Sequence, residues 1–300
     1  MKKSYAALLV ILAGVLWGSS GLFVHILAPL GYSSAHMTAI RSGTAAIGLL
    51  FYSLSFKREL FRVRKIDLCI FALSAIGLFG TGSCYFFSMQ ASSVATAVVL
   101  MYTAPVYVMI FSVIFFGEKL SGARITALVL MLAGAALVSG VAGEVSFSLS
   151  GILMGILAGI SYGAYNILTK LSLRRGASVL SSNIYVFCMT ALISLFFASP
   201  ASLIEVTKKA PAYTPLLLAA LGVITFLLPY LCYTYAMKRL DATTTASLGI
   251  AEPLSASLFG IFLLGEEYDP YIILGVVLIL AAILLTCKDG GREQSSQNKS

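Results

Sequence analysis

The chain has 300 residues, of which 59% are hydrophobic and 11% charged, and its mean hydropathy is +0.96. Because soluble globular proteins carry roughly 25% charged residues, this composition excludes a water-soluble fold. The formal net charge of +8 does not indicate nucleic-acid binding, because the basic residues are scattered between apolar blocks and form no basic helix face.

The apolar residues form successive blocks, each near the ~20 residues that a helix needs to cross a membrane. The alternating pattern of membrane β-strands is absent. The first block follows Lys2 and Lys3 and is too long for a usual signal peptide, so it predicts the first span. We predict an all-α polytopic membrane protein with ten transmembrane helices: 5–27, 34–56, 68–89, 93–116, 122–141, 150–172, 178–199, 214–237, 242–264 and 268–287.

The positions of Lys and Arg predict how these spans are oriented. If the N-terminus is cytoplasmic, 17 of the 20 basic residues fall on the cytoplasmic side, in agreement with the positive-inside rule. The exceptions are Lys208, Lys209 and Arg41, which lies within the second span. We therefore predict a multi-pass protein of a bacterial-type inner membrane, with both termini cytoplasmic and a disordered tail over residues 288–300.

Spans three to five are repeated as spans eight to ten at an offset of 148 residues, and a weaker match near offset 145 relates span one to span six. The identities pair Cys84-Tyr85 with Cys232-Tyr233, Pro105 with Pro253, and Gly117-Glu118 with Gly265-Glu266. Since each copy holds five spans, an odd number, the two copies must cross the membrane in opposite orientations. The sequence therefore predicts two inverted five-helix repeats, residues 1–145 and 146–287, with a substrate site between them near the middle of the membrane.

Several short motifs resemble those of the EamA family of the drug/metabolite transporter superfamily. They are Leu16-Trp17-Gly18-Ser19-Ser20, Ala39-Ile40-Arg41, Thr103-Ala104-Pro105-Val106, Phe116-Gly117-Glu118-Lys119-Leu120, Ala251-Glu252-Pro253-Leu254 and Leu264-Gly265-Glu266. The similarity covers about residues 5–287. It implies a ten-helix transporter of amino acids, other metabolites or cationic compounds, and it does not indicate which of these is carried.

Two charged side chains lie well inside predicted spans and away from their ends, where a charge costs at least ~2.5 kcal/mol. For Arg41, two interpretations are open: it holds a substrate carboxylate, or it forms a structural ion pair or hydrogen bonds to helix carbonyls. For Glu252, the interpretations are binding of a cationic group, acceptance of a proton during coupling, pairing with Arg41, and a purely structural role.

Prolines and polar aromatic residues complete the set of candidates. Pro105 and Pro253 predict bends in spans four and nine, either in moving gate helices or as static kinks. The aromatic residues either bind an aromatic or cationic substrate or pack in the core. The candidate substrate-binding residues are Trp17, Ser20, Arg41, Tyr85, Tyr102, Tyr162, Asn166, Tyr230, Tyr233 and Glu252.

The sequence shows no P-loop and no cluster of acid, base or metal ligands, so we expect no enzyme activity, no catalytic residue, no metal and no cofactor. We predict a secondary transporter that exports amino acids or related metabolites by alternating access. Import of a small amine or amino acid is the alternative, and a membrane enzyme is less favoured. The expected partners are a small-molecule substrate, the lipid bilayer, a coupling proton or ion and a second copy of the chain in a homodimer, but no nucleic acid.

Overall fold

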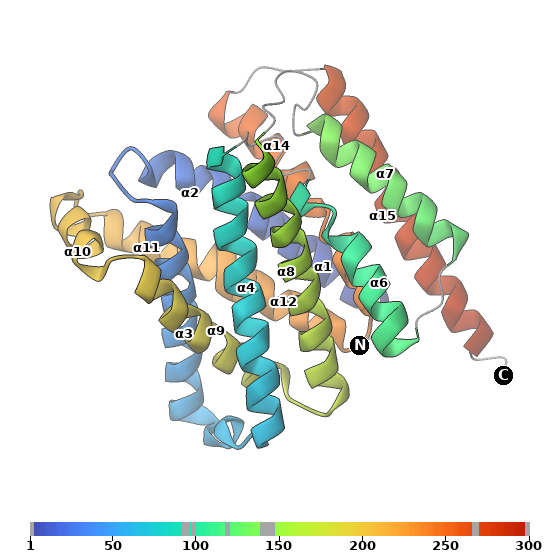
Figure 1. The fold of residues 1–300 in the computed structure, drawn as a ribbon, viewed down its shortest axis with the longest axis horizontal. Helices are drawn as coiled ribbons and strands as arrows, with labels where there is room; N and C mark the ends of the chain where they lie inside the picture. The colour runs from blue at the N-terminus through green and yellow to red at the C-terminus, as the bar shows by residue number, and fades with distance from the viewer. Residues whose placement is uncertain are drawn as a thin grey trace.

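The computed structural model describes residues 3–91, 97, 100–117, 121–138, 148–265 and 270–297, and these residues form helices and connections without a β-strand (Figure 1). Seven helical segments are long and apolar enough to cross a membrane: Lys3–Leu27, Ala35–Phe56, Lys65–Tyr85, Leu149–Arg174, Val179–Phe197, Thr214–Met237 and Ala242–Leu264. Three shorter apolar helices, Ala104–Phe116, Gly122–Leu137 and Ile273–Thr286, fall within the other three predicted spans.

The first half of the chain contains α1 (Lys3–Gly18), α2 (Ser20–Leu27), α3 (Ser34–Phe56), the 3₁₀-helix η1 (Arg58–Phe61), α4 (Lys65–Ala91), α6 (Ala104–Phe116) and α7 (Gly122–Val138). The second half contains α8 (Leu149–Arg174), α9 (Val179–Phe197), α10 (Pro200–Lys209), α11 (Thr214–Gly222), the π-helical turn η2 (Val223–Leu227), α12 (Leu228–Met237), α13 (Ala242–Leu248), α14 (Ala251–Leu264) and α15 (Pro270–Gln297). Helix α15 thus continues past the predicted end of the last span into the segment expected to be disordered, and residues 298–300 lie outside the described residues.

Two of the predicted spans are interrupted just before a proline. The turn at Tyr102 and Thr103 precedes α6, whose second residue is Pro105, and the turn at Gly249 and Ile250 precedes α14. Proline has no N–H to donate to the carbonyl one turn earlier, so an α-helix is weakest at that point. Both predicted bends therefore take the form of a break in the helix.

Two further interruptions were not expected from the sequence. The first span breaks at Ser19, whose Oγ donates to the Leu16 carbonyl at 2.7 Å. The eighth span contains η2, which lies just before Pro229. A π-helical turn adds one residue to the helical repeat and so rotates the residues that follow it.

The helices of one half of the chain pack mainly against helices of the other half. Helix α4 packs on α8 and α1 on α12, while α6 packs on α8 and α14 on α1. Glycines allow the closest of these approaches: a Cβ at Gly14 would lie 2.8 Å from the Ala251 Cβ, and one at Gly159 would lie 3.1 Å from the Thr103 Oγ1. Small residues at such positions let two helix backbones come close together.

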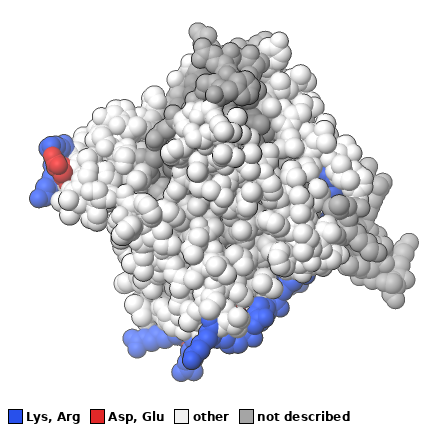
Figure 2. All heavy atoms as spheres, viewed as in Figure 1, with Lys and Arg blue, Asp and Glu red and all other residues white. Residues whose placement is uncertain are grey.

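Basic residues gather at one end of the helix bundle. Figure 2 shows Lys and Arg along the lower edge of the molecule, where Figure 1 places the connection from α3 to α4 and the connection from α8 to α9. We call this the basic end, and the other end of the bundle the opposite end. Under the positive-inside rule, the basic end is expected to face the cytoplasm.

The basic end is held closed by polar contacts between the two halves of the chain. Arg64 donates to the Asp67 carboxylate at 2.7 Å and to the Arg175 carbonyl at 2.7 Å, and Arg175 lies 3.6 Å from Asp67. Nearby, Asp241 caps α13 by accepting a hydrogen bond from the Thr244 N–H at 2.7 Å. All seven residues of α13 are buried, so this short helix fills the basic half of the bundle.

Candidate functional site

One cavity of about 670 Å³ lies in the middle of the bundle and extends toward the opposite end. Helices α1, α2, α3, α4, α6, α12 and α14 all contribute to its wall. His25, near the end of α2, lines it and is exposed. Sites for small molecules in proteins have volumes of about 300–1,000 Å³, so this cavity has room for a metabolite.

Most of the candidate residues from the sequence meet at this cavity, although they come from both halves of the chain. The residues that line it are Trp17, Ser20, Arg41, Tyr85, Tyr102, Tyr162, Tyr230 and Glu252, together with Pro105 and Pro253.

Asn166 and Tyr233 are the two candidates that the structure places elsewhere. Neither side chain is exposed, and the Tyr233 hydroxyl donates to the Asn166 Oδ1 at 2.5 Å. The Asn166 amide also donates to the Tyr162 carbonyl at 2.8 Å. These two residues therefore form a hydrogen-bonded layer next to the cavity on its basic side, and they do not line the cavity.

Arg41 projects from α3 into the cavity without a charged partner at close range. Within the described residues it forms no ion pair at 4.0 Å or less, and its buried Nε has no hydrogen-bond partner. Its guanidinium carbon lies 5.5 Å from the centroid of the Phe226 ring, which is a weak cation–π contact. A partly buried guanidinium whose Nε has no partner offers a binding position for a carboxylate or phosphate.

Glu252 supplies the opposite charge on the other side of the cavity. It lies in the first turn of α14, directly after the break at Gly249, and its N–H donates to the Gly249 carbonyl at 3.0 Å. Its carboxylate lies near the phenol of Tyr102 and interacts with it electrostatically. Glu252 interacts electrostatically with Arg41 but does not form a direct ion pair with it among the described residues. The two charges are therefore held apart, each facing the same cavity.

An aromatic cluster packs between these charges and the basic half of the bundle. Trp17, the only tryptophan, contacts the Tyr230 ring edge-on at 5.0 Å and the Tyr233 ring at 5.3 Å. Tyr230 in turn contacts Phe226 at 4.8 Å and Tyr165 at 5.7 Å. Such aromatic pairs contribute about 0.5–1.5 kcal/mol each beyond their buried area, so the cluster stabilises this wall of the cavity.

Sequence reasoning missed two residues that the structure makes prominent. Phe226 lies under Arg41, and its position four residues before Tyr230 already placed both on one helix face. Lys170 was counted only as one of the basic residues on the cytoplasmic side, but the structure buries it, with 7% of its surface exposed. Lys170 follows Asn166 by four residues and Tyr162 by eight, and this spacing already indicated that all three lie on the same face of the helix.

The arrangement is suited to binding and not to catalysis. A cation and an anion face each other across a space lined by aromatic rings, which matches a small molecule carrying both charges. Among the described residues, no group of three or more His, Cys, Asp or Glu side chains could hold a metal ion.

The model of the EamA-like transporter family matches residues 4–140 and again residues 149–287. A crystal structure aligns with a TM-score of 0.80 over 97% of this chain and 99% of that chain, at 19% identity, and so shares the fold. These matches, together with the apolar helices and the cavity, define a helical membrane transporter. The chain belongs to the EamA-like transporter family.

Several relatives are similar over nearly the whole chain. An uncharacterized transporter of Archaeoglobus fulgidus is 28% identical over 95% of this chain and 97% of its own length. A probable terminal-alkyne amino-acid exporter of Streptantibioticus cattleyicolor is 26% identical over 95% of this chain and 94% of its own length. An S-adenosylmethionine/S-adenosylhomocysteine transporter of Chlamydia trachomatis is 26% identical over 94% of this chain and 88% of its own length. All are named as transporters, which agrees with the prediction that this chain is not an enzyme.

Proposed function

We propose that this protein exports a small amino-acid-like metabolite by alternating access. The observation that carries the proposal is the presence of Arg41 and Glu252 in one cavity without a direct ion pair between them. A substrate carboxylate would accept hydrogen bonds from Arg41, and a substrate ammonium group would lie near Glu252 and the aromatic rings. Two relatives support this choice, because one is named as a probable amino-acid exporter and the other as an S-adenosylmethionine/S-adenosylhomocysteine transporter. The ligands in those names also carry both a carboxylate and an ammonium group.

The proposal includes ten spans arranged as two inverted repeats, residues 1–145 and 146–287. The packing of the helices supports it. The contact of α1 with α12 has its counterpart in the contact of α8 with α4, and the contact of α1 with α14 has its counterpart in that of α8 with α6. Gly14 on α1 packs against Ala251, and Gly159 on α8 packs against Thr103, which is the equivalent position at the 148-residue offset. Such an exchange of partners is what a pseudo-two-fold axis produces.

Import of a small amine or amino acid is a second candidate, for a specific reason. The cavity extends toward the opposite end, which is external if both termini are cytoplasmic as we propose. An importer and an exporter both pass through an outward-facing state, and they differ in the side from which net transport runs. Glu252 is also the proposed site of proton coupling if transport is coupled to protons.

Ligand identification comes first in the test of this function. Purified protein is screened against amino acids, amines and nucleosides for a rise in thermal stability, because a ligand at 100 times its Kd adds about 2.7 kcal/mol. Transport of each hit is then measured in everted and in right-side-out vesicles. We expect net movement out of the cytoplasmic compartment. Import in right-side-out vesicles alone would favour the second candidate, and a folded protein that moves no compound of the panel would contradict transport.

A further inference from the structure

A second pocket lies at the basic end, between the last turns of α8 and α12. It has a volume of about 320 Å³ and is lined by Lys170, Leu173, Arg174, Gly176, Ala177, Met237, Lys238 and Arg239. Four of these residues are basic, and the described lining contains no Asp or Glu. Exposed basic residues are expected wherever helices end at the cytoplasm, but their convergence on one pocket from two helices requires a separate explanation.

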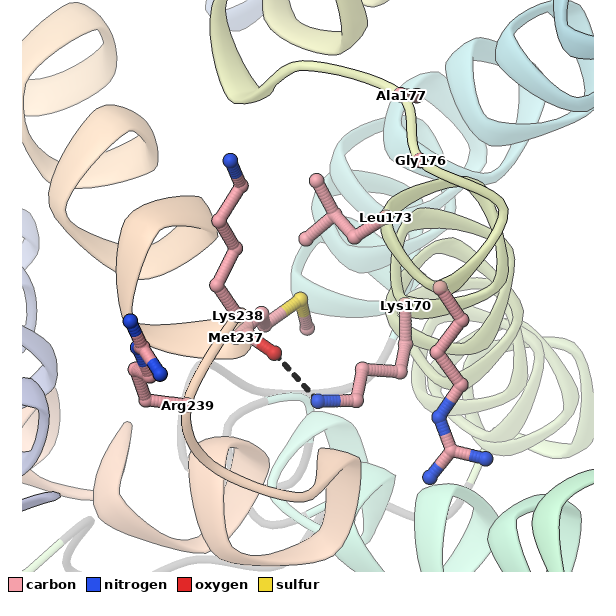
Figure 3. Close-up of a pocket in the computed structure, with 8 residues that line it drawn as sticks. Lys170, Leu173, Gly176, Ala177, Met237, Lys238 and Arg239 are labelled. Carbon is pink, nitrogen blue, oxygen red and sulfur yellow. Dashed lines mark hydrogen bonds between the residues drawn. The ribbon is translucent and has the colours of Figure 1, made fainter.

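Lys170 distinguishes this pocket from an ordinary basic surface. Its residue is buried, and its ammonium group donates hydrogen bonds to the carbonyls of Met237 and Leu240 at the end of α12. Figure 3 shows the Lys170 side chain reaching across from α8 to the Met237 carbonyl. These carbonyls carry the partial negative charge of a helix C-terminus, which a cation stabilises. Lys170 therefore ties α12 to α8.

The pocket and the central cavity lie on one line along α8. Tyr162, Asn166, Lys170 and Arg174 are spaced four residues apart, so they share one face of the helix at steps of about 6 Å. Tyr162 lines the cavity, while Lys170 and Arg174 line the pocket. Between them lies the layer formed by Asn166 and Tyr233, which are fully buried and joined by a 2.5 Å hydrogen bond.

Hydrogen bonds from α8 to the α12 region thus form part of the barrier between the two spaces. These hydrogen bonds can be exchanged, because a polar group of the substrate can accept a hydrogen bond from the donor that now binds a protein carbonyl. A carboxylate is a stronger acceptor for an ammonium group than a backbone carbonyl is. An anion that enters the pocket therefore competes with Met237 and Leu240 for Lys170, and it favours the state in which α12 is released from α8.

We propose that this pocket is the cytoplasmic access site for the anionic group of the substrate, and that Lys170 couples its arrival to opening of the α8–α12 gate. This inference rests on the proposed transport function and adds to it an initial binding position. It also restricts the substrate class: the substrate carries a carboxylate or phosphate that reaches Lys170 before it reaches Arg41. Lys170 is here a gating residue, because in the closed state it acts through α12.

The first test measures anion preference without transport. Leu173→Cys places a thiol in the pocket, and its rates of modification by a negatively and a positively charged methanethiosulfonate reagent are compared in phosphatidylcholine nanodiscs. Site-resolved mass spectrometry separates this thiol from the native cysteines. We expect the anionic reagent to react about tenfold faster, and we expect this preference to disappear in the Lys170→Met and Arg174→Gln backgrounds. The Lys57→Gln background, which changes an exposed basic residue of the same end outside the pocket, should retain the preference.

A phospholipid headgroup is the other source of the same anionic chemistry, and a second arm distinguishes it. The modification is repeated in nanodiscs with added phosphatidylglycerol. If the lipid abolishes the reaction in the parent Leu173→Cys protein, the pocket holds a headgroup and the access role is overturned. Equal rates for both reagents, or a preference that Lys170→Met leaves intact, would also overturn the proposal. An unchanged tenfold preference in the presence of the lipid supports it.

The second test measures transport from each side with a ligand found by the thermal screen. In everted vesicles, where the basic end faces the medium, Lys170→Met and Lys238→Gln should raise the apparent KM about tenfold. In right-side-out vesicles the KM should not change. An equal change from both sides would overturn the access role, because it would indicate damage to the central cavity. If Lys170→Met does not fold, the exposed Lys238 provides the same comparison. Failure of the transport function itself would appear as absence of flux in the unsubstituted protein and would leave the thiol data unaffected.

Discussion

At the scale of single residues, the two charges of the central cavity have the largest expected effects. Arg41 has a buried Nε without a partner, and Glu252 is in contact with Tyr102. Burial of a charge in a membrane span costs at least ~2.5 kcal/mol, so a protein that retains both charges gains something from them. Ligand binding supplies that gain if the ligand carries the complementary charges.

The first prediction concerns Arg41. Because loss of one partner of a buried, hydrogen-bonded charge pair costs 2–5 kcal/mol, Arg41→Ala should reduce kcat/KM for transport roughly 30-fold or more. Arg41→Lys keeps the charge but loses the two-pronged geometry, so it should recover only part of the activity. Transport is measured in vesicles, with Lys208→Ala on α10 as the matched control, which should transport normally. Wild-type transport by folded Arg41→Ala protein would remove Arg41 from the binding site.

The second prediction concerns Glu252. Glu252→Gln preserves the size and the polar character of the side chain near Tyr102 but removes the negative charge. Binding of a ligand with an ammonium group should weaken at least tenfold, whereas binding of the matched carboxylate without that group should change little. Isothermal titration with such a pair of ligands measures both effects. An equal loss for both ligands would mean that Glu252 has a structural role instead.

At the scale of elements, the function depends on helices that are broken where they meet the cavity. Both breaks, at Tyr102-Thr103 and at Gly249-Ile250, come shortly before a proline. The break at Gly249-Ile250 places Glu252 in the first turn of α14, where it lines the cavity. The helices α1 and α8 support these breaks through glycines that accept close contact.

The third prediction concerns the break between α13 and α14. Pro253→Ala restores a backbone N–H that can join the two helices, so we expect unchanged or higher thermal stability together with at least tenfold slower transport. The measurement pairs thermal unfolding with vesicle flux. Pro211→Ala, in the connection between α10 and α11, is the control and should affect neither. If Pro253→Ala transports at the normal rate, the break is only a static feature of packing.

The fourth prediction concerns the contact of α1 with α14. A Cβ at Gly14 would lie 2.8 Å from the Ala251 Cβ and 3.0 Å from the Glu252 backbone nitrogen. Gly14→Ala should therefore destabilise the fold by about 1–3 kcal/mol through overpacking. Gly43→Ala on α3 meets nothing within 4 Å and should be neutral or slightly stabilising. Thermal unfolding of both variants decides the matter, and equal midpoints would contradict the close approach.

At the scale of the whole molecule, the charge distribution and the position of the cavity both indicate how the protein is oriented across the membrane. The basic residues cluster at one end (Figure 2), and the cavity extends toward the other. Two features close the basic end. One is the set of contacts among Arg64, Asp67 and Arg175, and the other is the buried helix α13. We therefore expect the described conformation to represent the outward-facing state of the proposed transport cycle.

The fifth prediction tests this orientation in cells. A membrane-impermeant thiol reagent added outside should label Glu205→Cys on α10 but not Lys57→Cys at the basic end. Lysis should make the second site reactive as well. Mass spectrometry of each labelled peptide separates these sites from the native cysteines. Labelling of Lys57→Cys in intact cells would reverse the topology and with it the assignment of the pocket near Lys170 to the cytoplasm.

The membrane class, the family and eight of the residues that line the central cavity followed from the sequence alone, because each depends on a local signal. A run of apolar residues is visible in the chain itself, and a charge such as Arg41 or Glu252 within that run is recognisable as an interior residue. The repeat at 148 residues was also visible directly, and it related the two prolines before the helix breaks were known.

Only the tertiary structure decided which faces of the helices meet. Tyr233 and Asn166 have the same residue types as other cavity candidates, yet they bond to each other and leave the cavity wall. Lys170 resembles the other basic residues near a helix end, but the approach of α12 buries it against two carbonyls. These outcomes depend on the rotation of each helix about its axis, which the interruptions at Ser19 and at η2 change and which hydrophobicity does not encode.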